Sequence, residues 1–207
     1  MVVIVGFIKK TRWLPSEKVM KNYPDGTYEV CDVGIRTVHT KDIIGLGLRP
    51  RDIANDNKMK RLRQSVATKG WKDESPIDLH LYLTPDGKYA VWTGGNHRPY
   101  LADELRIPSI EASVDVVIPK GKIFEKTANE IDTLRRNYQN LEKEANELNK
   151  LLQPQRFRQG GYNDADENKL NAMFDQLTSI HNQVEMLLKK EAYHLGYIPE
   201  DWVQSDS

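Results

Sequence analysis

The sequence predicts an α+β fold, in which a mixed sheet with flanking helices is followed by a long antiparallel helical hairpin of coiled-coil type. Three observations favour this fold. Several short segments have the apolar or alternating pattern of strands. Residues 55–71 have the apolar spacing of an amphipathic helix. Beyond residue 120, apolar residues recur with a heptad period. We therefore expect two domains, residues 1–118 and 119–207.

The first strand-like segments are VVIVGFI (2–8) and YEVCDVGIRTV (28–38), and the turn YPDG lies between them. A helix is expected to begin at Asn55 or Asp56, either of which can cap its free backbone N–H groups. Its apolar positions, which recur at intervals of three and four residues, are Met59, Leu62 and Val66. Gly70 is expected to end this helix.

A β-hairpin is the next expected element. The strands IDLHLYL (77–83) and YAVW (89–92) are joined by the turn TPDGK. Two glycines follow, and then RPYLADEL (98–105) is expected to form a helix with Pro99 in its first turn. The segment IPSIEASVDVVI (107–118) is expected to be the last strand.

The C-terminal part contains two heptad seams. The first contains Phe124, Ile131, Leu134, Tyr138, Leu141, Ala145, Leu148 and Leu152. The second contains Leu170, Met173, Leu177, Ile180, Val184 and Leu187. Pro154 and the Gly160–Gly161 pair are expected to break the pattern between the two helices. The resulting hairpin indicates packing or self-association, and the basic and aromatic loop residues Arg156, Phe157, Arg158 and Tyr162 could stack on nucleic-acid bases.

The composition limits the classes of function. Thirty basic and thirty acidic residues cancel, so net charge does not indicate nucleic-acid binding. Cys31 is the only cysteine, which excludes an intramolecular disulfide or a cysteine metal cluster within the chain. The apolar run near the N-terminus is too short for a signal peptide, and no segment approaches the roughly 20 apolar residues of a membrane span. We expect a cytoplasmic protein without a membrane partner.

The loop GGNHR (94–98) has the features of an anion-binding site. Glycines allow backbone N–H groups to approach a ligand closely, and a helix N-terminus provides free donors. His97 could act as an acid or base, and Arg98 has a guanidinium suited to phosphate oxygens. Basic residues also concentrate upstream, where residues 49–72 contain eight Lys or Arg against two acids. The candidates for DNA contacts in this stretch are Arg49, Arg51, Lys60, Arg61 and Arg63.

In order and spacing, these segments resemble the ParB/sulfiredoxin-like superfamily over roughly residues 34–118. The matching pieces are RPRD before the basic helix, SPID before the strand, the Gly-x-His-Arg loop, and IPSIEA. The resemblance implies a nucleotide, which could be ATP, ADP or CTP, held with Mg²⁺. The residues that it assigns to nucleotide binding are Lys58, Ser65, Gly94, Gly95, Asn96, His97 and Arg98.

The chain also departs from its proposed relatives. Sulfiredoxins have a cysteine where this chain has Asn96, and an amide cannot act as a thiolate nucleophile, so we do not expect sulfiredoxin activity. A heptad hairpin replaces the helix-turn-helix domain of ParB proteins, so centromere reading is not expected. ParB-related serine kinases use an acidic base, for which Asp73 and Glu74 are candidates; alternatively both are turn residues.

The sequence is compatible with three functions. The first is a ParB-like, DNA-associated protein that binds or hydrolyses a nucleoside triphosphate, with a ParB-like nuclease as a variant. The second is a small-molecule kinase or other phosphotransferase. The third is a non-enzymatic interaction protein, of the kind that phages and plasmids encode, acting through the hairpin. In the first and third cases, residues 120–195 would form a homo-oligomer or bind a protein partner.

Overall fold

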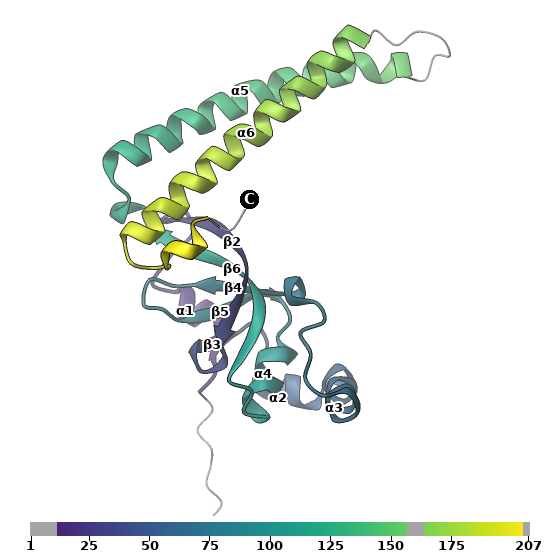
Figure 1. Cartoon of the computed structure of the whole chain (residues 1–207), viewed down its shortest axis with the longest axis vertical. Coiled ribbons are helices and arrows are strands. Elements are labelled where there is room, and N and C mark those ends of the chain that lie inside the picture. The colour runs from purple at the N-terminus through teal and green to yellow at the C-terminus, as the bar shows by residue number, and fades with distance from the viewer. Residues whose placement is uncertain (1–11, 157–163, 205–207) are drawn as a thin grey trace, which may run out of the picture. The chain divides into compact units, whose positions relative to one another are not determined.

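The computed structural model describes residues 12–156 and 164–204, and the chain divides into two compact units, residues 1–117 and 118–207. The expected strand at residues 2–8 lies outside the described residues. Unit 1 contains a mixed sheet with helices, and unit 2 contains two long helices, so the α+β class predicted from the sequence is confirmed (Figure 1).

The sheet of unit 1 has six strands in the order β1-β3-β5-β4-β6-β2. The strands are β1 (Leu14–Pro15), β2 (Tyr28–His39), β3 (Ile43–Leu46), β4 (Leu79–Leu83), β5 (Tyr89–Gly94) and β6 (Ser109–Pro119). The pairs β1–β3, β3–β5 and β4–β6 are parallel, whereas β4 and β5 are antiparallel. The sheet is therefore mixed, because the antiparallel β4–β5 hairpin lies between the parallel pairs β3–β5 and β4–β6.

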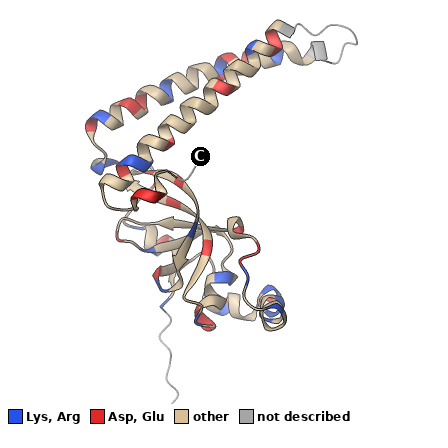
Figure 2. Ribbon diagram, in the orientation of Figure 1, with Lys and Arg blue, Asp and Glu red and all other residues tan. Residues whose placement is uncertain are grey.

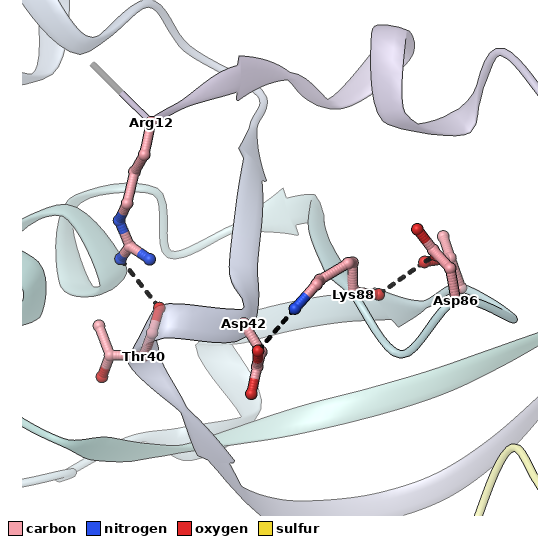
Figure 3. Close-up of polar contacts among 6 residues, drawn as sticks. Arg12, Thr40, Asp42, Asp86 and Lys88 are labelled. Carbon is pink, nitrogen blue, oxygen red and sulfur yellow. Dashed lines mark hydrogen bonds and ion pairs between the residues drawn. The ribbon is translucent and has the colours of Figure 1, made fainter. Parts of the chain in front are cut away.

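The β4–β5 hairpin is fixed at its turn and along its edge. The Thr84 hydroxyl donates a hydrogen bond to the Lys88 carbonyl at 2.8 Å, across the turn that contains Gly87. The Lys88 ammonium pairs with Asp42 at 2.8 Å, which ties the hairpin to the start of β3 (Figure 3). Nearby, Arg12 donates to the Thr40 carbonyl at 2.9 Å.

Four helices accompany the sheet: α1 (Ser16–Met20), α2 (Pro50–Asn55), α3 (Asn57–Lys69) and α4 (His97–Glu104). The expected helix over 55–71 begins at Asn57 in the structure, because Asp56 is in an extended conformation and caps α3 by accepting a hydrogen bond from the Lys58 N–H. Gly70, at φ +75°, ends α3. Short 3₁₀ turns, Thr40–Asp42 and Pro76–Asp78, precede β3 and β4.

The core of unit 1 lies against the central strands. Leu79 and Leu81 of β4 and Leu101 and Ala102 of α4 are all inaccessible to solvent. The alternation of strand side chains places Leu79 and Leu81 on one face of the sheet, so α4 is fixed by burial of its apolar face. This packing fixes the start of α4 beside the end of β5.

Unit 2 is an antiparallel pair of helices, α5 (Glu125–Arg156) and α6 (Asp164–His194). The buried core of the seam contains Ala145, Leu152, Leu170, Met173 and Leu177, as the heptad pattern predicts. At the base of the pair, Glu191 of α6 accepts a hydrogen bond from the Thr127 hydroxyl at 2.6 Å and another from the Phe124 N–H, so it caps α5. This cap links the start of one helix to the end of the other.

Two details of unit 2 differ from the prediction. Phe124 precedes α5 and is 63% exposed, so it is outside the seam. The helix α5 also continues past Pro154 to Arg156, because a proline in the last turn removes a single backbone hydrogen bond and need not end a helix at once. Phe157, Arg158, Gly160, Gly161 and Tyr162 lie outside the described residues, as does the side chain of Arg156. Within the described ranges, no helix is long and apolar enough to cross a membrane.

Candidate functional site

A cavity of about 600 Å³ lies in unit 1 between α3 and the loop that joins β5 to α4. Its lining residues are Lys58, Arg61, Leu62, Ser65, Asp78, Gly94, Gly95, His97 and Arg98. The residues from α3 recur at intervals of three and four, so they share one face of that helix. The loop and the first residues of α4 supply the opposite wall.

The two glycines are required by close packing. Both have positive φ, +65° at Gly94 and +51° at Gly95, a region that favours glycine. A Cβ on Gly95 would lie 2.7 Å from the Leu79 Cα, so a larger residue would push the loop away from β4. The Gly-Gly pair therefore keeps the loop tight against β4, which places the N-terminus of α4 at the cavity.

Asn96 supports the loop and does not line the cavity. Its Oδ1 accepts hydrogen bonds from the Gly47 N–H at 2.7 Å and the Leu48 N–H at 3.3 Å. Its Nδ2 donates to the Gly94 carbonyl at 3.1 Å. The amide thus joins the loop to the segment after β3, a role that needs both a donor and an acceptor. Asn96 is not among the residues that line the cavity.

His97 is nearly buried and is held by Asp56. Its Nε2 lies 2.9 Å from Oδ2 of Asp56, and its side chain is 9% exposed. The other carboxylate oxygen of Asp56 accepts from the Lys58 N–H at 3.0 Å. These contacts lower the pKa of Asp56, with the Lys58 backbone N–H as the largest cause and the His97 hydrogen bond next. Asp56 therefore connects the starts of α3 and α4, the two walls of the cavity.

Arg98 is also anchored within the protein. Its guanidinium pairs with Asp73 and donates to the Ser75 carbonyl at 2.6 Å and to the Glu111 carbonyl at 3.3 Å. The Arg98 side chain is 14% exposed, and the Asp73 side chain is 17% exposed. Asp73 thus orients and neutralises a cavity cation, whereas Glu74 is exposed and does not line the cavity. Asp73 therefore positions the Arg98 guanidinium, and neither Asp73 nor Glu74 lines the cavity.

The face of α3 supplies the cations that remain available. Within the described part of the chain, neither Lys58 nor Arg61 makes an ion pair with a carboxylate, and the Ser65 hydroxyl has no hydrogen-bond partner. An unpaired guanidinium, an ammonium and a free hydroxyl on one helix face match the acceptor oxygens of a phosphate. This face is the part of the cavity best suited to an anion.

Figure 2 shows Lys and Arg side chains along α3. The basic residues predicted to contact DNA nevertheless differ in their surroundings. Arg61 lines the cavity. Arg49 pairs with Asp52 at 2.8 Å, and Arg63 pairs with Glu104 at 2.7 Å. Arg51 and Lys60 are exposed and lie outside the cavity. The residues of the stretch therefore do not form one uniform patch of free cations.

Asp78 is a cavity residue that reasoning from the sequence missed. It is the last residue of the 3₁₀ turn before β4, and it brings a carboxylate to a cavity with three basic side chains. The segment SPID could have indicated this position, because a polar residue at the start of a strand beside a glycine loop is well placed to line a site. Within IDLHLYL, its pattern predicts only a strand residue.

Comparisons of the chain with family models, with curated proteins and with solved structures found no match. The described residues contain no group of three or more His, Cys, Asp or Glu arranged to hold a metal ion.

Proposed function

We propose that the chain binds a nucleotide in this cavity, with its phosphates held between α3 and the loop before α4. The observation that carries the proposal is the pair of cations, Lys58 and Arg61, that face the Gly94–Gly95 loop without an ion-pair partner among the described residues. The volume of about 600 Å³ is in the usual range for small-ligand sites. The ParB/sulfiredoxin-like resemblance supports the same ligand class.

Each wall has a distinct part in this proposal. Lys58, Arg61 and the Ser65 hydroxyl would contact phosphate oxygens directly, since their polar ends are not engaged elsewhere. His97 and Arg98 would border the ligand while their bonds to Asp56 and Asp73 keep the loop in place. Mg²⁺ binds nucleotides through phosphate oxygens and few carboxylates, so the single carboxylate of Asp78 fits a metal held mainly by the ligand.

Calorimetric titration tests nucleotide binding directly. ATP, ADP, CTP and GTP would each be titrated into the chain with and without Mg²⁺. We expect at least one of them to bind. Lys58→Ala or Arg61→Ala should weaken this binding by about tenfold or more, because each removes a charge-assisted hydrogen bond.

Lys60→Ala is the matched control for both variants. Lys60 is on the same helix and has the same charge as Lys58, but it does not line the cavity. Its replacement should leave the affinity within about twofold, as expected for an exposed charge outside the site. Absence of binding by all four nucleotides, or equal losses in the three variants, would contradict the proposal.

A phosphotransferase reaction is the second candidate, because Asp78 brings a carboxylate into the cavity that holds the cations. A carboxylate beside bound phosphates can accept the proton of an attacking hydroxyl. Asp78→Asn should then abolish transfer from labelled ATP to a metabolite pool while leaving nucleotide binding in place. Loss of binding and activity together would instead assign Asp78 to ligand binding.

DNA association stays a prediction. Arg51 and Lys60 are exposed and unpaired among the described residues, whereas Arg49 and Arg63 have carboxylate partners. Fluorescence anisotropy with duplex DNA at low salt tests it, because phosphate contacts by these side chains should weaken steeply as salt rises. Absence of binding at low salt would remove DNA from the proposed function.

A further inference from the structure

A groove with a volume of about 540 Å³ lies along α6 in unit 2. Most of its lining comes from one stripe of α6, which contains Asp175, Ser179, Asn182, Gln183, Met186 and Lys190. These positions recur at intervals of three and four residues, so they share one face of the helix. Glu130 of α5 borders the groove. The α6 stripe belongs to unit 2 alone and is separate from the proposed nucleotide cavity of unit 1.

The middle of the α6 stripe is uncharged, although the chain as a whole is rich in charged residues. The nine residues 176–184 contain no Asp, Glu, Lys or Arg, whereas 29% of the chain is charged. The side chains that this part of the helix exposes in the groove are those of Ser179, Asn182 and Gln183, and Met186 follows with 39% exposure. Depletion of charge and enrichment of methionine are typical of the centre of a protein–protein interface. The composition therefore favours a protein surface as the occupant of the groove.

The charged residues of the α6 stripe are at its two ends. Asp175 and Lys190 are fifteen positions apart, which corresponds to about 22 Å along a helix. Both side chains are exposed, and within the described part of the chain neither makes an ion pair. The midpoint between them falls between Asn182 and Gln183. The stripe is thus acidic at one end, basic at the other and uncharged at its centre.

This distribution makes the α6 stripe complementary to an antiparallel copy of itself. A two-fold axis through the midpoint places Asp175 opposite Lys190 of the second copy, and the reverse contact follows by symmetry. The same axis places Asn182 opposite Gln183, and amide side chains can both donate and accept hydrogen bonds. A two-fold interface requires such self-complementarity, because the same surface is used on both copies. A parallel arrangement would instead bring like charges together at both ends.

We propose that the α6 groove binds α6 of a second copy of this chain, and that the two helices run antiparallel in a symmetric dimer. Asp175 of each copy pairs with Lys190 of the other, so two ion pairs flank the uncharged centre. Ion pairs at the ends of an interface fix its orientation and register more than its affinity. This dimer is independent of nucleotide binding, and it assigns a defined contact and register to the helical hairpin.

Analytical ultracentrifugation of the full chain over a range of concentrations tests the dimer. The wild type should show a reversible equilibrium between monomer and dimer. Asp175→Lys and Lys190→Glu should each raise the dissociation constant by about fivefold or more, because each places like charges opposite one another at both ends of the contact. The double variant exchanges the two charges, so its dissociation constant should return to within about twofold of the wild-type value.

Lys143→Glu is the matched control for these reversals. Lys143 is an exposed lysine on α5 that does not line the groove, so the variant should dimerise as the wild type does. Asp175 and Lys190 are exposed as well, so their replacement should leave the helices intact, which circular dichroism checks.

Cysteine crosslinking tests the register. Cys31 is buried, so the wild type should crosslink little and provides the background. Asn182→Cys lies next to the proposed axis and should form a disulfide between copies on mild oxidation. Two copies of Ser179→Cys would be about 10 Å apart along the helices, beyond the roughly 4.4–6.8 Å between Cα atoms that a disulfide spans, and should not crosslink.

Four results would overturn the proposal. They are a chain that stays monomeric at every concentration, charge reversals that leave dimerisation unchanged, a double variant as weak as the single variants, and crosslinking of Ser179→Cys in preference to Asn182→Cys.

Discussion

Replacement of Gly95 by alanine tests how the loop before α4 is built. Gly95 has φ +51°, and an alanine in that region is strained by about 1–2 kcal/mol. The added Cβ would also lie 2.7 Å from the Leu79 Cα, well inside the contact distance of about 3.5–4.0 Å between carbon atoms. Backbone shifts that relieve such overpacking cost about 1–3 kcal/mol, so we expect a total loss of about 2–5 kcal/mol.

Gly87→Ala is the matched control for this change. Gly87 also has positive φ, +73°, but a Cβ there would meet nothing within 4 Å, so only the backbone strain of about 1–2 kcal/mol is expected. Urea unfolding followed by tryptophan fluorescence suits the test, because Trp13, Trp71 and Trp92 are all in unit 1. Equal destabilisation by the two substitutions would refute the inference that Gly95 is required by contact with β4.

Three further predictions concern the supports of the site. Asn96→Ala should destabilise unit 1 by about 1–3 kcal/mol, since it leaves the N–H groups of the segment after β3 without their acceptor, whereas Asn96→Asp should retain much of that stability. Asp73→Asn should lower the urea midpoint by releasing the Arg98 guanidinium, and exposed Glu74→Gln should leave the midpoint unchanged; the reverse order would contradict the positioning role. The folded pKa of Asp56 is below its usual value of 3.8, so its charge stabilises the fold above that pH and the contribution disappears as the pH falls through the folded pKa. The difference in urea midpoint between wild type and Asp56→Asn should therefore shrink between about pH 6 and about pH 2, and a constant difference would count against this assignment.

Local patterns in the sequence predicted most of the elements, because each pattern depends on residues close together in the chain. Asp56 as a helix cap, Gly70 as a helix end and the turn between the β4 and β5 strands are of this kind. Lys58 and Ser65 were expected at the site from the ParB/sulfiredoxin-like resemblance, and both line the cavity, since residues seven apart share a helix face.

The contacts that define the site depend on residues far apart in sequence, so local patterns could not predict them. Asn96 bonds to Gly47, and Arg98 pairs with Asp73. The run of charges predicts a DNA contact for Arg61, because such a run does not reveal which side chain lines a cavity. The position of Asp78 in the cavity likewise depends on how the 3₁₀ turn before β4 meets the glycine loop.

Mapping amide shifts by nuclear magnetic resonance on addition of nucleotide and Mg²⁺ tests the central claim most directly. The account predicts that the amide signals of Gly94, Gly95 and Ser65 move with saturation, because these residues line the proposed phosphate site. The signal of Gly87, at the other end of the hairpin, should stay in place. Unmoved signals at the loop and at α3 during saturating additions of ATP and CTP would contradict nucleotide binding in this cavity.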